Sequence, residues 1–311
     1  MIKKQFLAIF LLFILTLSFF TSCGSDESKN GELTITDADG KVFGIPKAPR
    51  VVCAYGSFAE CWLLSGGKLV GTTDDAVSER RLELSEDTVI VGSVKSIDIE
   101  RVISLRPDLV ILSADLTAHR SLALQLADLG IAAALFRVDS FSDYDAMMKQ
   151  FCAVNGGDSL YTKHVTEVKN GIDRIRSAIP ESAPKREILV MRAYSGGIKV
   201  KTDNLAEDIA CELGCVSLAR EYPSMLTSLS VEAIIASDPD MIFVLTMGDE
   251  TEATEYMKNY FYGNPALSSL TAVKNERLYL LPKELFHYKP NNKWNESYEY
   301  LAKIIYPEIF G

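Results

Sequence analysis

The chain has 311 residues, 48% of them hydrophobic and 24% charged, and a formal net charge of −10. This composition is typical of a folded globular protein, and the length favours two lobes over a single core. Nucleic acids and anionic membrane surfaces attract clustered Lys and Arg, so the acidic balance disfavours both as binding partners.

The first 22 residues are predicted to be a secretory signal peptide. Lys3 and Lys4 precede an apolar stretch at residues 6–20, which is short beside the roughly 20 residues of a membrane-spanning helix. Small residues then precede Cys23, and this pattern resembles the lipobox of bacterial lipoproteins. We therefore expect an exported lipoprotein of the cell envelope, anchored through acylated Cys23 with residues 23–32 as a polar tether. An ordinary cleaved signal with an incidental cysteine is the alternative.

Five cysteines follow Cys23, at positions 53, 61, 152, 211 and 215. Because five is an odd number, they cannot all pair within the chain. Cys211 and Cys215 are one helical turn apart, where a disulfide is geometrically awkward, and no histidine lies nearby to complete a metal site. We expect packing in the core to be their role.

Residues 33–153 are predicted to form a first α/β lobe. Alternating apolar residues around Asp39-Gly40 predict a hairpin over residues 33–45. The apolar pattern then predicts strands at 51–55, 69–72, 89–92, 109–112 and 131–136, with helices at 57–64 and 117–129. Short apolar strands that alternate with helices are typical of a parallel sheet.

A long helix is predicted to join this lobe to a second one. Apolar residues recur at helical spacing from residue 141, pause at Gly156-Gly157 and continue unbroken over residues 159–179. We therefore expect a linker helix within residues 154–184, with a length of about 30 Å. Residues 185–311 then predict a second α/β lobe, with strands at 187–192, 241–245 and 277–281 and helices at 204–213 and 298–305.

Residues 96–114 are echoed 132 positions later by residues 228–246. The identical pairs include Ser96 and Ser228, Glu100 and Glu232, Pro107 and Pro239, and Asp108 and Asp240. Each copy predicts a helix, a proline that ends it and a buried strand, so we expect one unit built twice. The alternative to a duplication is that connections from a helix through Pro-Asp to a strand look alike in any α/β protein. The repeated glutamates are best explained by the helix dipole, which stabilises an acidic first turn by about 0.3 to 1 kcal/mol.

Further motifs carry a family resemblance. They are Pro49-Arg50-Val51-Val52, Glu60 with Gly66-Gly67, and residues 69–72, 100–112 and 265–279. In order and spacing they resemble the ABC-transporter periplasmic solute-binding proteins of the iron-siderophore, haem and cobalamin cluster, over nearly all of residues 33–311. The resemblance implies an α/β fold of two Rossmann-like lobes with central, mainly parallel sheets, joined by one long α-helix.

The same resemblance implies a function. A monomeric, lipid-anchored protein would capture a metal chelate between its lobes, with little hinge closure, and deliver it to an ABC-transporter permease. The implied ligand is an iron-siderophore or haem, with cobalamin or another corrinoid as the alternative, and no resident cofactor is expected.

The ligand cleft is predicted from strand topology. In parallel α/β sheets ligands lie just beyond the carboxyl ends of the strands, and this rule selects loops in both lobes. The predicted ligand-binding residues are Tyr55, Ser57, Asp75, Lys95, Arg192, Tyr194, Met247, His287 and Tyr288. Lys95 and Arg192 suit carboxylate or catecholate oxygens, and the tyrosines supply flat apolar surface with a polar tip.

Each of these residues also has a plainer interpretation. Exposed Lys and Arg are usually solvated, Tyr194 can cover a turn, and Met247 can fill the core. His119 paired with His287 or Tyr194 would provide two axial ligands for haem iron, although histidines also occur as ordinary surface or loop residues.

Permease docking is a further implication of the resemblance. An exposed Glu on each lobe would pair with permease arginines, and Glu250, Glu252 and Glu255 are the candidates in the second lobe. The comparable stretch of the first lobe, residues 115–120, contains Asp115 but no Glu.

An exported two-lobed metalloenzyme is the competing class. No G-x-G-x-x-G follows the first strand, and the sequence lacks a G-K-[ST] phosphate loop and a G-x-S-x-G elbow. Its histidines and cysteines also lack the spacing of a catalytic metal site. We therefore expect a binding protein with no catalytic and no metal-ligating residues.

Overall fold

The computed structural model describes residues 33–202, 204–223 and 231–311. The predicted signal peptide, the tether and Cys23 lie outside these residues, as does Ser228, with which the second repeat copy begins. Among the described residues, no helix is both long and apolar enough to span a bilayer.

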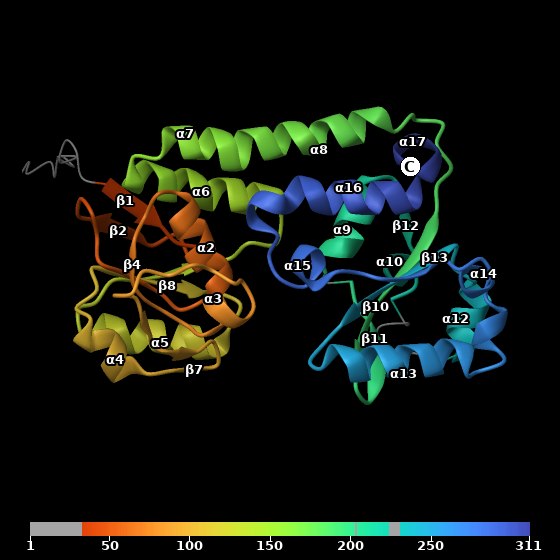
Figure 1. Cartoon of the computed structure of the whole chain (residues 1–311), viewed down its shortest axis with the longest axis horizontal. Helices are drawn as coiled ribbons and strands as arrows, with labels where there is room; N and C mark the ends of the chain where they lie inside the picture. The colour runs from red at the N-terminus through yellow and green to blue at the C-terminus, as the bar shows by residue number, and fades with distance from the viewer. Residues whose placement is uncertain (1–32, 203, 224–230) are drawn as a thin grey trace, which may run out of the picture. The chain divides into compact units, whose positions relative to one another are not determined.

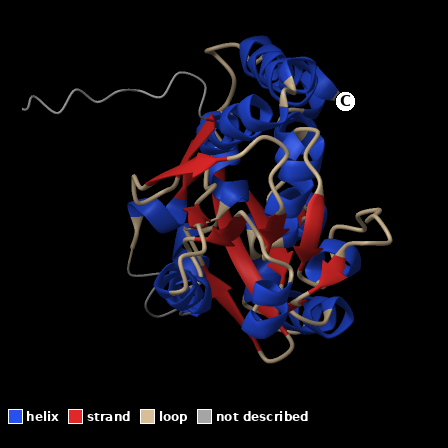
Figure 2. Ribbon diagram, turned by 90° about the vertical axis from the view of Figure 1, so that its left-hand side faces the viewer, coloured by secondary structure: helices blue, strands red, loops and turns tan. Residues whose placement is uncertain are grey.

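The N-terminal lobe is built on a parallel five-stranded sheet with helices on both faces (Figures 1 and 2). The strand order β5-β4-β3-β8-β9 comprises β3 (Val51–Cys53), β4 (Leu69–Thr72), β5 (Val89–Ile90), β8 (Leu109–Ser113) and β9 (Ala133–Phe136). The helices are α2 (Gly56–Leu64), α3 (Asp75–Ser78), α4 (Ile99–Ser104) and α5 (Thr117–Asp128). Two hairpins complete the lobe: the predicted β1 (Leu33–Thr36) with β2 (Val42–Ile45), and β6 (Gly92–Ser93) with β7 (Ser96–Ile97).

The C-terminal lobe has a second five-stranded sheet, in the order β11-β10-β13-β14 with β12 also on β10. Its strands are β10 (Glu187–Tyr194), β11 (Gly197–Val200), β12 (Val216–Ser217), β13 (Met241–Thr246) and β14 (Leu278–Leu280). The helices are α9 (Leu205–Glu212), α10 (Leu218–Glu221), α12 (Val231–Ser237), α13 (Glu250–Tyr262), α14 (Thr271–Lys274), α15 (Lys283–Phe286), α16 (Trp294–Ile305) and α17 (Pro307–Phe310). All strands pair in parallel except β11, which forms an unpredicted hairpin with β10.

The sequence repeat forms the same joint in both lobes. The residue before each repeated proline is in the left-handed region, with φ of 47° and 37°. The repeated aspartate then accepts a backbone hydrogen bond at the start of the neighbouring strand: Asp108 Oδ2 from Arg50 N at 2.7 Å, and Asp240 Oδ2 from Glu187 N at 3.0 Å. These bonds fix the register of β8 against β3 and of β13 against β10. The duplication is therefore present in the structure as well as in the amino-acid sequence.

Both sheets bury both faces, and one apolar cluster contains residues of both lobes. On the N-terminal sheet, Val51 and Ile111 belong to this shared core, whereas Val52 and Val110 belong to a cluster on the opposite face. The C-terminal sheet follows the same alternation: Phe243 belongs to the shared core, whereas Ile242 and Val244 on either side of it belong to a cluster on the opposite face. Burial on both faces explains why these strands are continuous apolar runs in the sequence.

Helices from three parts of the chain cover the shared core. Residues of α6 (Phe141–Asn155), α8 (Glu167–Ala178) and α16 all belong to it, and α8 runs beside α16 (Figure 1). The predicted pause between helices is present, because Gly156 ends α6 with φ of 69°. The predicted long helix follows as α7 (Asp158–Tyr161), a π-helical segment η2 (Thr162–Thr166) and α8 in succession.

The predicted fold class is confirmed: the chain forms two α/β lobes with mainly parallel sheets. The boundaries expected between lobe, linker helix and lobe stay a prediction. Cys53, Cys61 and Cys152 lie in the shared core, where burial raises the pKa of each thiol.

Candidate functional site

A pocket of about 520 Å³ is lined by residues of both lobes. The N-terminal lobe supplies the residues that follow β8 and β9, and the C-terminal lobe supplies the ends of β10 and β13, the start of α9 and the segment before α16. The lining residues are Asp115, Val138, Asp139, Arg192, Asn204, Leu205, Asp208, Leu245, Phe286, His287, Tyr288, Lys289 and Trp294. The lining therefore includes strand ends of both sheets, which is the kind of region that the strand-end rule selects.

The C-terminal wall of the pocket carries two cations and a histidine. Arg192 lies within β10, opposite Leu245 of β13 and Lys199 of β11, so its backbone is held on both sides by the sheet. Burial lowers the pKa of His287, and the nearby charges of Lys283 and Arg192 lower it further. His287 is therefore neutral at physiological pH, with one ring nitrogen able to donate a hydrogen bond and the other able to accept one.

The carboxylates on the pocket wall are paired with cations. Asp115 Oδ1 accepts a hydrogen bond from Arg137 Nε at 2.7 Å, and Asp139 Oδ1 lies 3.2 Å from Lys289 Nζ. Asp208 pairs with an arginine of α10. The contact between Asp139 and Lys289 crosses from one lobe to the other, so it closes one side of the pocket while it balances both charges.

A buried polar clamp joins the lobes beside the pocket. Asn291, which is fully buried, donates through Nδ2 to Ser57 O at 2.9 Å and to Glu60 Oε2 at 2.5 Å. Arg80 forms an ion pair with Glu60 and donates through Nη1 to Lys289 O at 3.0 Å. Asn291 has φ of 53°, a left-handed conformation that Asn tolerates better than most residues. The clamp therefore holds the pocket-lining segment before α16 against helix α2.

Three predicted site residues lie in the N-terminal lobe near this clamp. Asp75 is buried and accepts hydrogen bonds from Gly56 N at 2.7 Å and Thr73 Oγ1 at 2.6 Å, so its carboxylate holds the start of α2, where Tyr55 and Ser57 lie. Burial raises the pKa of Tyr55 to about 12, with neighbouring carboxylates adding to the shift. Tyr55 therefore remains a protonated phenol.

The other predicted residues lie outside the lining of the pocket. Lys95 is exposed in the turn between β6 and β7. Tyr194 ends β10, with Lys199 Nζ 6.0 Å from its ring centroid, and Met247 directly follows β13. Glu250, Glu252 and Glu255, the predicted docking residues, are exposed on α13. Of the predicted ligand-binding set, the pocket thus brings together Arg192, His287 and Tyr288.

The axial-ligand prediction for His119 is wrong. Its side chain is fully buried, Nδ1 accepts a hydrogen bond from Ser113 N at 2.9 Å, and Nε2 donates to Val94 O at 2.9 Å. Both ring nitrogens are therefore engaged within the lobe, where His119 ties α5 to the end of β8. Burial is the main cause that lowers its pKa.

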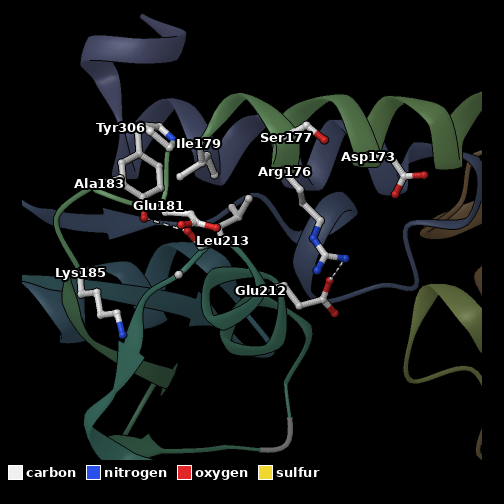
Figure 3. Close-up of a pocket in the computed structure, with 12 residues that line it drawn as sticks. Asp173, Arg176, Ser177, Ile179, Glu181, Ala183, Lys185, Glu212, Leu213 and Tyr306 are labelled. Atoms are coloured by element: carbon white, nitrogen blue, oxygen red, sulfur yellow. Dashed lines mark hydrogen bonds and ion pairs between the residues drawn. The ribbon is translucent and has the colours of Figure 1, made fainter.

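A second pocket, of about 530 Å³, lies at the end of α8 (Figure 3). Three of its polar side chains are already engaged within the fold: Arg176 Nη1 lies 3.4 Å from Glu212 Oε2, which also accepts a hydrogen bond from Tyr298, and the Tyr306 hydroxyl donates to Leu213 O at 2.8 Å. No strand end contributes to its lining. We therefore place the candidate site in the interlobe pocket.

Comparison with known proteins identifies the family. Residues 51–285 match the periplasmic binding protein family. The chain belongs to this family. The Fe(3+)-citrate-binding protein YfmC of Bacillus subtilis (strain 168) is 26% identical to this periplasmic binding protein, over 89% of each chain. The uncharacterized ABC transporter substrate-binding lipoprotein YvrC of the same strain is 24% identical over 92% of this chain and 86% of its own.

A solved structure extends the comparison to the fold. The crystal structure of S. aureus IsdE complexed with heme is 17% identical, with a TM-score of 0.68 over 83% of this chain and 99% of that one. The predicted family resemblance is confirmed, and the family supports a binding protein in place of an enzyme. The family match ends at residue 285, so His287, Lys289 and Trp294 of this periplasmic binding protein lie beyond it.

Several pocket residues were missed in the sequence. Val138 and Asp139 lie in the segment that follows the end of β9, so the strand-end rule is the signal that points to them. Leu205, Asp208 and Trp294 lie on α9 and α16, for which the rule gives no signal.

Replacing Asn291 by Asp tests the clamp. The variant keeps the size of the side chain and tolerates the left-handed backbone, but it removes the amide donor and places a second carboxylate beside Glu60. We expect chemical denaturation to show a loss of about 3 kcal/mol or more in the free energy of unfolding. Asn275→Asp, at an exposed position, is the matched control and should change stability little. Equal effects of the two substitutions would contradict the clamp.

The buried neutral imidazole of His119 predicts a pH-dependent stability. Its pKa is lowered in the folded state, so its contribution is complete above pH 6.5 and is lost as pH falls and the unfolded chain binds the proton. The stability difference between wild type and His119→Gln should therefore shrink between pH 7 and pH 5.5, by at most about 1 kcal/mol. Denaturation curves at several pH values measure it, and a constant difference would mean that His119 titrates normally in the fold.

Proposed function

We propose that this periplasmic binding protein is the solute-binding component of an ABC importer and binds an anionic, oxygen-rich iron chelate in its interlobe pocket. The observation that carries the proposal is the joint placement of Arg192, His287 and Lys289 on one wall of a pocket that both lobes line. The pocket volume of about 520 Å³ suits a small-molecule ligand.

The chemistry of this wall favours oxygen ligands with negative charge. A guanidinium binds carboxylates, hydroxycarboxylates and catecholates through two parallel hydrogen bonds, and the ammonium of Lys289, whose charge Asp139 balances, adds further N–H donors. The neutral His287 adds one donor and one acceptor. The name of the relative YfmC, an Fe(3+)-citrate-binding protein, supports a hydroxycarboxylate chelate as the first ligand to test. Iron would enter the pocket as part of the bound chelate.

Haem is the second candidate ligand. A neutral imidazole on the pocket wall is able to coordinate haem iron, and His287 is the one histidine in the pocket lining. Because His119 is engaged elsewhere, the second axial ligand would have to come from another residue or from water. A Soret band on addition of haem distinguishes this candidate from a hydroxycarboxylate chelate.

The proposal also covers location and docking. Acylation of Cys23 would anchor a monomeric protein in the cell envelope, and the name of the relative YvrC, a substrate-binding lipoprotein, supports that anchor. The exposed Glu250, Glu252 and Glu255 on α13 are the surface we propose for contact with permease arginines.

Arg192→Ala tests the ligand site. Loss of a bidentate, charge-assisted contact should weaken binding of ferric citrate at least tenfold, measured by isothermal titration calorimetry. Lys95→Ala removes an exposed lysine outside the pocket lining and should change the affinity less than threefold. An unchanged affinity in Arg192→Ala, or a larger loss in Lys95→Ala, would place the ligand elsewhere.

Cys23→Ala tests the anchor. The variant lacks the thiol that would receive the lipid, so the protein should move from the membrane fraction to the soluble fraction after cell fractionation. Membrane association that persists in the variant would contradict lipidation at this residue.

A further inference from the structure

We propose that Trp294 contacts the ligand directly, with its indole N–H donating a hydrogen bond to an oxygen of the bound chelate. This inference rests on the proposed function and deepens it, because it adds a neutral donor to the two cations and the histidine. Trp294 lies outside the residues that match the family, so its role is argued from its surroundings in this chain.

The first observation is an unsatisfied polar group. Trp294 is 2% exposed, and its Nε1 is buried without a hydrogen-bond partner among the residues that the structure describes. Burial of an N–H group without a partner is unfavourable, and a Phe at this position would avoid the penalty while filling much of the same space. A small shift of the side chains that cover Nε1 would let a ligand oxygen in the pocket that Trp294 lines reach and satisfy the group.

The second observation is the place of Trp294 between two pockets. It lines the interlobe pocket and also an adjoining pocket of about 520 Å³, and both share Asp139, Leu205 and Asp208. The adjoining pocket is walled in part by Phe141 and by apolar residues of α9 and also contains Arg220, whereas the interlobe pocket holds Arg192 and Lys289. The indole thus stands where the charged compartment meets the more apolar one.

The indole is also held in place before any ligand binds. Its ring packs edge-on against Phe141 of α6, with 6.0 Å between ring centroids. Trp294 begins α16, and the clamp residue Asn291 precedes it by three positions. A donor fixed by packing in this way loses little entropy when it binds, which favours a direct contact over a flexible one.

Trp62 provides the internal comparison, because the chain contains only two tryptophans. Trp62 is fully buried, and its Nε1 donates to Lys68 O at 3.0 Å. Its ring packs against Phe151 in the shared core, and it lines neither the interlobe pocket nor the adjoining one. One indole N–H is therefore satisfied within the fold, and the other is buried without a partner in a residue that lines both pockets.

Nuclear magnetic resonance of the indole groups tests the proposal without perturbing the site. Mature wild-type protein with 15N-labelled tryptophan should give two indole signals, and Trp62→Phe identifies the signal of Trp294 by elimination. Gallium(III) citrate serves as the diamagnetic probe in place of ferric citrate. We expect the Trp294 signal to shift on binding and the Trp62 signal to stay within the line width.

Affinity measurements supply the matched variants. Trp294→Phe should weaken ferric citrate binding about tenfold, as expected for one hydrogen bond to a charged oxygen, while Trp62→Phe should bind like wild type. If wild type binds the probe but the Trp294 signal and the Trp294→Phe affinity do not change, the contact is refuted and the proposed function stands. If wild type binds neither ferric citrate nor gallium(III) citrate, the proposal that this protein binds a citrate chelate is refuted, and the proposed Trp294 contact is refuted with it.

Discussion

The shared apolar core is the constraint on which the rest of the structure depends. It joins Phe58 and Phe136 of the N-terminal lobe with Phe243 of the C-terminal lobe and with the covering helices α6, α8 and α16. Two lobes that share one core cannot be separated without exposing it to water, so their relative placement is set largely by the hydrophobic effect. The pocket exists because this placement brings strand ends from both sheets to one region.

Polar contacts between the lobes set the detailed geometry of the pocket, within the lobe arrangement that the shared core produces. The clamp of Asn291, Glu60 and Arg80 fixes the segment before α16, which carries His287 and Lys289 into the pocket. Loss of one partner in the clamp leaves a buried polar or charged group without the bond that holds it, which is costly to stability. The site therefore depends on interlobe packing for its existence and on a few hydrogen bonds for its geometry.

Much of the fold was predictable, because strand burial and the repeat leave strong periodic patterns in the sequence. The strand-end rule selected Arg192 from the sequence, and this residue lies near the end of a central strand in the pocket lining. Lys95 and Lys289 cannot be told apart from the sequence, because both are loop lysines. Only tertiary contacts determine that Lys289, held by Asp139, lines the pocket. Trp294 gave no signal either, since an aromatic residue at a helix start is usually a core residue, and its unpaired N–H is visible only in three dimensions.

The central claim is that the interlobe pocket binds an anionic iron chelate. Hydrogen–deuterium exchange of the mature protein, with and without saturating ferric citrate, tests it most directly because it reports on both lobes at once. The account predicts slower exchange in residues 115–120 and 137–141 of the N-terminal lobe and in residues 285–295 of the C-terminal lobe. Slower exchange confined to residues 173–185 and 306, around the pocket at the end of α8, would contradict it.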